Sequence, residues 1–411
     1  MMMSVITTIF CVFLSINSIS SLLIDDECYQ YYSIFGIHIN NIKIETCQEV
    51  DVVHLPKEEI PRFVLYVEDK NKSEIFITPV NQHDNGSLMN KSTPIFVLWN
   101  KIFNHEDSTE GNLTHVNEFA PDLANFSFYH NPSRNVALVL FYYGSFSVVE
   151  GVVGDYTLRF IERTQKYIWM KMRHPHERIP INWKSLGAPE VKNLELSDYN
   201  LNSHINAVNI STVVFLDNLS IQEKLPTELV KSVLIYFNAV NMLYANFTSP
   251  RIQLVIKALM VPITVYGKTY DVLQPQKLFE NHNDSWLEPI VIFNMMITPV
   301  CKHSNSKICI AHGKIHNNRL YCDEKDISKK SPSIYHIRHM DLQHGYSKAA
   351  QMLALSLNAS LLDYTDECSG IMNAYQDPPD LPLFWSNCTI NKLSNYFRSV
   401  NDTCFRETAL L

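Results

Sequence analysis

The hydrophobic pattern of this 411-residue chain changes partway along its length, and that change restricts the folds it can adopt. Before residue 175, short runs rich in β-branched and aromatic residues alternate with polar positions, as at 63–67 and 136–142, which predicts strands. After residue 205, strand-like runs alternate with segments whose apolar residues recur every three or four positions, which predicts helices. We therefore expect an α/β fold class, with a β-rich part followed by a mixed part.

Prolines and a glycine mark the place where the pattern changes. Pro175, Pro180, Gly187 and Pro189 interrupt any periodic run, which is typical of a linker. We expect a β-rich domain at 22–175, a linker at 176–204 and a mixed α/β domain at 205–411. Within the last domain, strands are predicted at 208–216, 251–260 and 289–297, and helices at 229–243, 346–357 and 389–400, the last with Thr389 as its N-cap.

The first residues have the character of a secretory signal. An apolar run is followed by small residues between Ser18 and Ser21, although no Lys or Arg precedes it; the alternative is a buried N-terminal helix. We expect cleavage of a signal peptide at 1–21. No other run approaches the roughly 18 consecutive apolar residues that a membrane span needs. The sequence therefore predicts a secreted, extracellular protein without a membrane span.

Cysteines and glycosylation sequons agree with an extracellular protein. One of the nine cysteines, Cys11, lies in the signal, and an even number remains, which suits disulfides in an oxidising compartment. Asn-x-Ser/Thr sequons are spread along the chain, which indicates a glycosylated surface. The candidate glycosylation sites are Asn71, Asn85, Asn90, Asn112, Asn125, Asn209, Asn218, Asn246, Asn283, Asn358, Asn387 and Asn401.

The charge of the chain argues against one class of partner. The net charge is −8, without long runs of one sign. Nucleic acids and anionic membrane surfaces attract basic patches, so neither is an expected partner.

The last third of the chain resembles the reprolysin (adamalysin) family of metzincin metalloproteases. Cys368-Ser369-Gly370-Ile371-Met372-Asn373 looks like the family's cysteine and Met-turn, and Trp385-Ser386-Asn387-Cys388-Thr389 looks like the segment before its last helix. Residues 229–259 are similar to the family's first long helix and the strand after it. Residues 310–313, followed by Cys322, look like its edge strand, and 151–160 is similar to the end of its propeptide. Secreted members from arthropod venoms and saliva look most alike.

The resemblance implies a fold and a set of disulfides. The fold is a metzincin-like catalytic-type domain, with a mixed sheet, helices and a Met-turn at Met372, preceded by a β-rich propeptide-like domain. The implied pairs are Cys368–Cys388, Cys322–Cys404 and Cys301–Cys309, which leaves Cys28–Cys47 for the first domain.

The residues that would perform the family's chemistry are replaced. The family places three zinc-binding histidines and a glutamate base in the motif His-Glu-x-x-His-x-x-Gly-x-x-His. The three ligand positions hold Gln351, Leu355 and Leu361, and the general-base position holds Met352. Asn358 stands at the glycine and begins a sequon, so a glycan at the former cleft is a further hypothesis. We expect that zinc binding and catalysis are lost and that no cofactor is present.

A group of histidines is the other candidate source of activity. His336, His339 and His344, with His303, His312 and His316 nearby, could form an alternative metal site, but a solvated His-rich loop explains them better, since Asp341 is the only carboxylate within the first cluster. Active relatives are usually released at a basic cleavage site. None occurs between the two halves, where 173–178 comes nearest.

The favoured interpretation is a secreted pseudoprotease that acts by binding. Its partner would be an unidentified protein target or an active relative, and the family association implies a venom component. The alternatives are an active zinc metalloendopeptidase with a non-standard ligand set, and a secreted structural glycoprotein.

Overall fold

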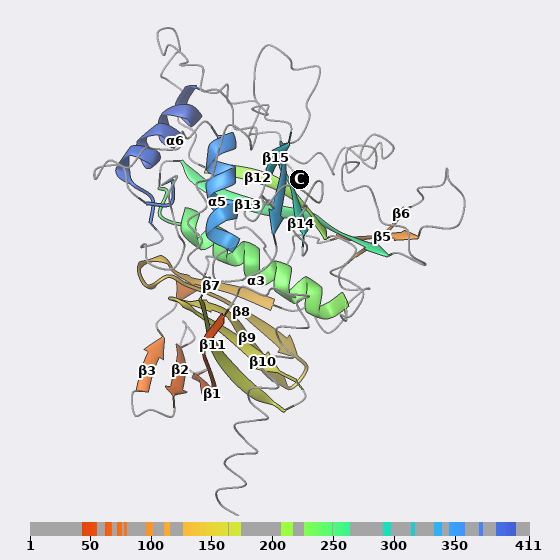
Figure 1. Ribbon diagram of the computed structural model, residues 1–411, viewed down its shortest axis with the longest axis vertical. Coiled ribbons are helices and arrows are strands. Elements are labelled where there is room, and N and C mark those ends of the chain that lie inside the picture. Colours follow the sequence, from red (N-terminus) through yellow and green to blue (C-terminus); the bar gives the residue numbers. More distant parts are fainter. Residues whose placement is uncertain are drawn as a thin grey trace, which may run out of the picture.

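The architecture comes from a computed structural model of the chain (Figure 1). It describes residues 43–55, 62–67, 72–75, 78–79, 96–101, 111–115, 126–162, 164–173, 207–216, 226–248, 250–263, 291–296, 314–316, 333–338, 345–357, 370–372 and 384–399.

The first half of the chain forms a nine-stranded sheet in the order β3-β2-β1-β11-β10-β9-β8-β7-β4. Every neighbouring pair in this sheet is antiparallel. Its strands are β1 (Lys43–Leu55), β2 (Arg62–Val67), β3 (Lys72–Ile75), β4 (Thr78–Pro79), β7 (Phe126–Asn131), β8 (Val136–Tyr143), β9 (Phe146–Val153), β10 (Tyr156–Ile161) and β11 (Lys166–Arg173). A short 3-10 helix, η2 (Pro132–Arg134), connects β7 to β8.

Strand β8 is buried on both faces because alternate side chains enter different cores. Ala137, Val139 and Phe141 belong to the large core shared with the helices. The residues between them, such as Leu138 and Leu140, belong to a second core with residues of β1 and β2. Since successive side chains of a strand point to opposite faces, β8 separates the two cores and contributes side chains to both.

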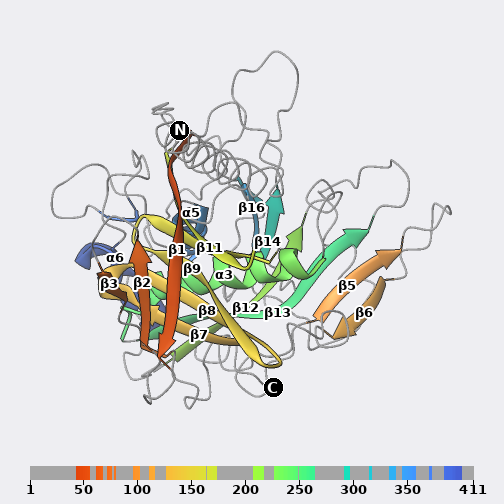
Figure 2. The same ribbon diagram turned by 90° about the horizontal axis from the view of Figure 1, so that it is seen from below.

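The second sheet has seven strands in the order β15-β16-β14-β12-β13-β5-β6. Figure 2 shows its course from β16 to β6. The five inner strands, from β16 to β5, are parallel, and the edge strands β15 and β6 are antiparallel to their neighbours. The strands are β5 (Phe96–Lys101), β6 (Gly111–His115), β12 (Ala207–Leu216), β13 (Arg251–Ile263), β14 (Val291–Met296), β15 (Lys314–His316) and β16 (Ser333–Arg338).

Helix α3 (Pro226–Tyr244) lies between the two sheets (Figure 1). It contacts β7, β8 and β9 of the first sheet, and also β13 and helix α5 (Gly345–Ser356). Every side chain from Val230 to Tyr244 is buried. Its apolar residues recur every three or four positions, which is typical of a helix with one buried face, but this helix is buried all round because both sheets and α5 surround it.

The predicted mixed α/β architecture is confirmed in its coarse form. Helices and strands occur at the predicted places after residue 205, but the last helix, α6 (Asn387–Ser399), begins before Thr389. Its cap is Ser386, whose Oγ accepts a hydrogen bond from the Thr389 amide at 3.3 Å. Among the described residues, no helix is long and apolar enough to cross a membrane.

Strands β5 and β6 cross the predicted domain division. They precede residue 175 in the chain, yet β5 pairs with β13 in the second sheet, from Phe96 opposite Ala258 to Lys101 opposite Ile263. The unpaired N–H and C=O groups at the edge of β13 can form hydrogen bonds with a strand from either half of the chain. Residues 22–175 therefore contribute to both sheets.

Candidate functional site

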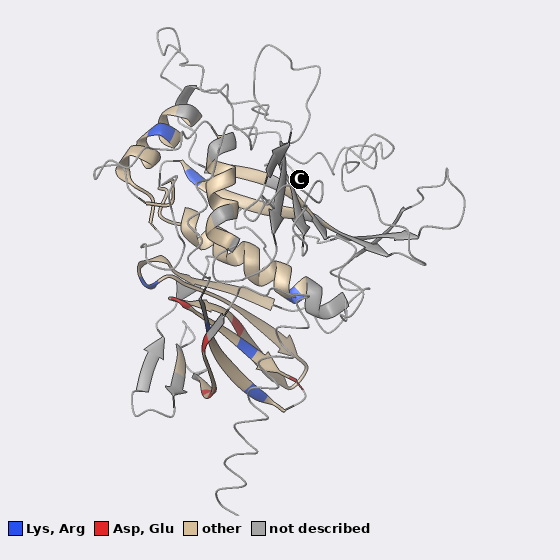
Figure 3. Cartoon of the chain, in the orientation of Figure 1, with Lys and Arg blue, Asp and Glu red and all other residues tan. Residues whose placement is uncertain are grey.

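The helix predicted to carry the former zinc motif is α5. It follows β16 and packs against both β16 and α3. Ala349 and Ala350 are fully buried, and the small side chains permit a close approach, in which the Tyr244 hydroxyl of α3 donates a hydrogen bond to the Ala350 carbonyl at 2.7 Å. The described side chains of α5 include no acidic or basic residue (Figure 3).

The first predicted ligand position is occupied by a buried amide. The Gln351 side chain is 2% exposed, and its Nε2 donates a hydrogen bond to the main-chain carbonyl of Ile371 at 2.8 Å. Ile371 and Met372, the residues of the predicted Met-turn, are also buried. The structure therefore brings the first ligand position and the predicted Met-turn into direct contact.

The segment 370–372 is held from its other side by the residues before α6. The Ile371 amide donates a hydrogen bond to the Phe384 carbonyl at 3.0 Å. Gly370 has a φ of 129°, and a Cβ there would lie 2.6 Å from the Phe384 oxygen. Only glycine fits this close approach without displacement of the backbone.

Trp385 fixes the same segment to α3. Its Nε1 donates a hydrogen bond to the Leu243 carbonyl at 2.8 Å. Its ring lies 5.0 Å from that of Tyr244 and 5.6 Å from that of Phe247, measured between centroids. The region around α5 is thus packed as a core.

The remaining predicted positions are only partly covered by the structure. Met352, at the general-base position, is 1% exposed. Leu355 lies in α5, but its side chain is outside the described part. Leu361 and Asn358 lie outside the described residues.

The alternative histidine cluster is also only partly covered. His336 was predicted to lie in a His-rich loop, but it lies in β16, and His316 lies in β15. His303, His312, His339 and His344 lie outside the described residues. Within the described part of the chain, no three His, Cys, Asp or Glu side chains are grouped as a metal site would need.

The predicted disulfides and glycosylation sites are placed in part. Cys47 and Cys388 are disulfide-bonded. Their predicted partners, Cys28 and Cys368, lie outside the described residues, as do Cys301, Cys309, Cys322 and Cys404, so the pairing stays a prediction.

Among the sequons, Asn246 and Asn387 are exposed, whereas Asn209 lies in β12 with its side-chain oxygen buried. Asn112 lies in β6, and its side chain is outside the described part. The sequons outside the described residues are Asn71, Asn85, Asn90, Asn125, Asn218, Asn283, Asn358 and Asn401.

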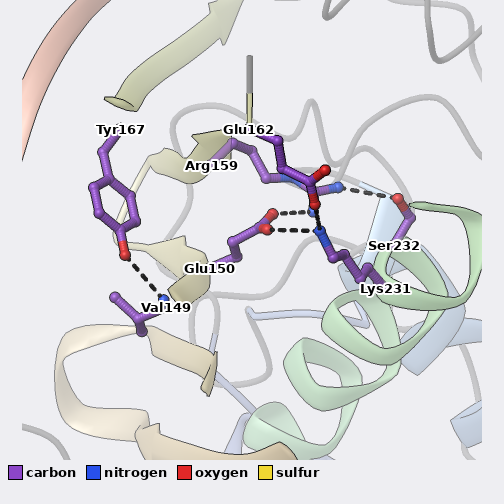
Figure 4. A network of polar contacts seen from close by, with 7 residues as sticks. All are labelled: Val149, Glu150, Arg159, Glu162, Tyr167, Lys231 and Ser232. Carbon is purple, nitrogen blue, oxygen red and sulfur yellow. Dashed lines mark hydrogen bonds and ion pairs between the residues drawn. The ribbon is translucent and has the colours of Figure 1, made fainter. Parts of the chain in front are cut away.

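A largely buried charge network, which sequence patterns did not predict, joins the first sheet to α3 (Figure 4). Glu162, whose side chain is 60% exposed, is its exposed member. Arg159 Nη1 lies 2.6 Å from Glu150 Oε2, and both side chains are 2% exposed. Lys231 of α3, also 2% exposed, lies 3.0 Å from Glu162 and 3.7 Å from Glu150. Arg159 Nη2 donates a further hydrogen bond to Ser232 Oγ at 3.1 Å. The cations and carboxylates of this network balance.

Tyr167 lies beside the same network. Its hydroxyl accepts a hydrogen bond from the Val149 amide at 3.2 Å. Burial raises the pKa of Tyr167 to about 12, and the nearby charge of Glu150 acts in the same direction. The tyrosine therefore stays neutral over the physiological range.

The only sequence signal of the charge network was single charged residues within apolar runs, such as Glu150 between Val149 and Gly151.

A second buried polar contact joins the same elements. His130 Nε2 lies 2.5 Å from Asn238 Oδ1, and Asn238 Nδ2 donates a hydrogen bond to the Leu138 carbonyl at 2.9 Å. Because Oδ1 can only accept, the neutral imidazole carries its proton on Nε2. Burial lowers the pKa of His130 to about 4, although the hydrogen bond with Asn238 acts in the opposite direction.

Comparison with known proteins gives little further information. No family model matches the chain, and no curated protein matches it. Among solved structures, metalloproteinase-II from Bacteroides fragilis is similar with 9% sequence identity and a TM-score of 0.37, over 86% of this chain and 92% of that one. A chaperone–substrate complex is similar with 9% identity and a TM-score of 0.29, over 62% of this chain and 39% of that one. At scores this low, neither similarity establishes a shared fold or activity.

Proposed function

We propose that this chain is a secreted, non-catalytic homologue of zinc metalloproteases that acts by binding. Its domain would be of the metzincin type, and its zinc binding and catalysis would be lost. Its partner would be a protein target or an active relative, in the setting of a venom-type secretion.

The observation that carries the proposal is the contact between Gln351 and Ile371. A zinc ligand in this position would need an imidazole nitrogen directed at the ion, with a further coordination position left open for water. Gln351 is instead buried, and its amide nitrogen donates to the main chain of the predicted Met-turn. A side chain in this arrangement serves the packing of α5 against 370–372.

The neighbouring residue supports the same conclusion. Hydrolysis at a zinc site needs a group that takes the proton from the metal-bound water. Met352 has a thioether, which accepts no proton at working pH, and it is buried. Zinc coordination and proton transfer would thus both have to come from other residues.

The order of the elements also supports the proposal. The resemblance implies a strand, a long helix and a second strand, then an edge strand ahead of the helix with the zinc motif. The chain has β12, α3 and β13, then β14, the antiparallel edge strand β15, β16 and α5. This order, with α5 packed against β16, is what the proposal requires if α5 corresponds to the motif helix.

A proteolysis assay tests the loss of catalysis. The purified chain is incubated with denatured protein substrates, with added zinc or with a chelator. We expect no chelator-sensitive cleavage in either case. Chelator-sensitive cleavage that disappears in a His336→Ala, His339→Ala, His344→Ala variant would contradict the proposal, because it would assign activity to the chain itself. Chelator-sensitive cleavage that the variant leaves unchanged, and that stays with the chain through a second purification step, would contradict the proposal as well.

A further inference from the structure

We infer that the first half of the chain is a permanent part of the folded protein, unlike a propeptide that leaves. A cut between Arg173 and Ala207 should leave the two pieces bound to each other without a covalent link. The inference does not depend on the proposed function, because it concerns the junction between the first sheet and α3.

The apolar contacts supply the first reason. Phe126, Phe128, Ala137, Val139 and Phe141 of the first sheet lie in one core with α3. The same core includes Tyr236, Phe237 and Val240. Removal of the first sheet would expose one side of a helix that is buried all round, and apolar surface returned to water opposes dissociation.

The charge network gives the junction its specificity. Lys231 lies near buried Glu150 of β9 and near the exposed Glu162, which directly follows β10, and Ser232 accepts a hydrogen bond from Arg159. Buried ion pairs add little affinity by themselves, since the charges lose hydration. They do exclude other registers, because any shift would leave a buried charge without its partner.

Two further hydrogen-bonded groups hold the pieces together. Asn238 of α3 bonds to His130 and to the Leu138 carbonyl, on neighbouring strands. At the start of α5, the Tyr346 hydroxyl lies 3.0 Å from Asn135 Nδ2, which donates to it. The first half thus contacts both α3 and α5, the helix of the candidate site.

Main-chain pairing supplies a separate connection. Strand β5 lies on the first side of the cut, yet it pairs with β13 on the second side. Departure of the first half would remove β5 and β6 from the second sheet and leave the edge of β13 unpaired. An exposed strand edge of this kind promotes aggregation, which further disfavours separation.

The experiment places a site for a sequence-specific protease between Arg173 and Ala207 of the full chain. After cleavage, a non-reducing denaturing gel should show two pieces, because the predicted disulfides do not cross the cut. Size-exclusion chromatography under native conditions should show one species of the uncut size, even at nanomolar concentration. Separate peaks, or a single band on the non-reducing gel, would overturn the inference.

Matched variants test whether the described contacts hold the pieces. Asn238→Ala removes both hydrogen bonds to the first sheet and should weaken the cut complex by about tenfold or more. Ser232→Ala is the milder version if Asn238→Ala fails to fold before cleavage. Lys166→Met, which breaks the exposed pair with Glu49 inside the first sheet, should leave the affinity unchanged. If the two pieces bind each other with the same affinity in both junction variants and in this control, the described contacts do not hold the pieces together, and that part of the inference is overturned.

Discussion

The side-chain amide of Gln351 and the main-chain carbonyl of Ile371 are joined by a buried hydrogen bond of 2.8 Å. This contact connects α5 to the predicted Met-turn at the point where the resemblance expects a histidine. In the proposed account, a position that binds zinc in the metalloprotease family stabilises the fold here.

Replacement of Gln351 by Met should therefore destabilise the protein. The volume is nearly kept, but the Ile371 carbonyl loses its donor in a buried place, which costs roughly 1–3 kcal/mol. Urea unfolding at pH 7 measures the change, with Lys392→Met on the exposed side of α6 as control. Equal stability of the two variants would contradict the structural role of Gln351.

Gly370→Ala should disturb the same contact from the other side. The φ of 129° and the 2.6 Å approach to the Phe384 oxygen both oppose a Cβ, so the expected loss is roughly 1–3 kcal/mol, with a displaced 370–372 segment. Gly154→Ala is the control, since its φ of 60° is strained but its surroundings are open. A Gly370 variant no less stable than the Gly154 variant would show that the close approach is unimportant.

His130 makes the junction with α3 sensitive to acid. Its folded pKa of about 4 lies below the ordinary value of 6.5, so the unfolded chain binds more protons between these values. The contribution of neutral His130 is complete above pH 6.5 and is lost as the pH falls toward 4. At pH 5 the expected loss is roughly 2 kcal/mol relative to pH 7.

The measurement compares unfolding free energies at pH 7 and pH 5 for the natural chain and for His130→Gln. The difference between the two chains isolates this histidine from the other titrating groups. If both chains lose the same stability on acidification, His130 is not the sensitive group.

Arg159→Met should be among the most destabilising single changes in the first sheet. It takes away the partner that lies 2.6 Å from the buried Glu150 carboxylate and leaves the 3.7 Å contact to Lys231, and such a removal costs about 3–5 kcal/mol. Lys166→Met breaks a pair whose lysine side chain is 51% exposed, and should cost less than about 1 kcal/mol. Thermal unfolding of both variants checks the ranking, and the reverse order would contradict the account of Figure 4.

Local patterns were enough to predict much of the second half. The spacing of apolar residues predicted α3, α5 and α6 to within a few positions, because the periodicity of a helix depends on residues only three or four positions apart. The error at Thr389 came from a similar local signal, since Ser386 three residues earlier can also cap a helix.

Contacts between distant segments could not be predicted in this way. Glu150, Arg159 and Lys231 each stand alone in an apolar run, and only the packing of the first sheet on α3 brings them together. For the same reason, nothing in residues 96–101 indicated that β5 would pair with β13. The hypothesis that the zinc ligands are replaced rests on residue types alone, whereas the hydrogen bond from Gln351 to Ile371 required the structure.

The zinc content of the purified, secreted chain tests the central claim most directly. Elemental analysis after brief dialysis without chelator should give a zinc-to-protein ratio near zero, and the His336→Ala, His339→Ala, His344→Ala variant should give the same ratio. One tightly held zinc per chain would contradict the loss of the metal site. If that zinc disappeared in the histidine variant, the metal would belong to those histidines.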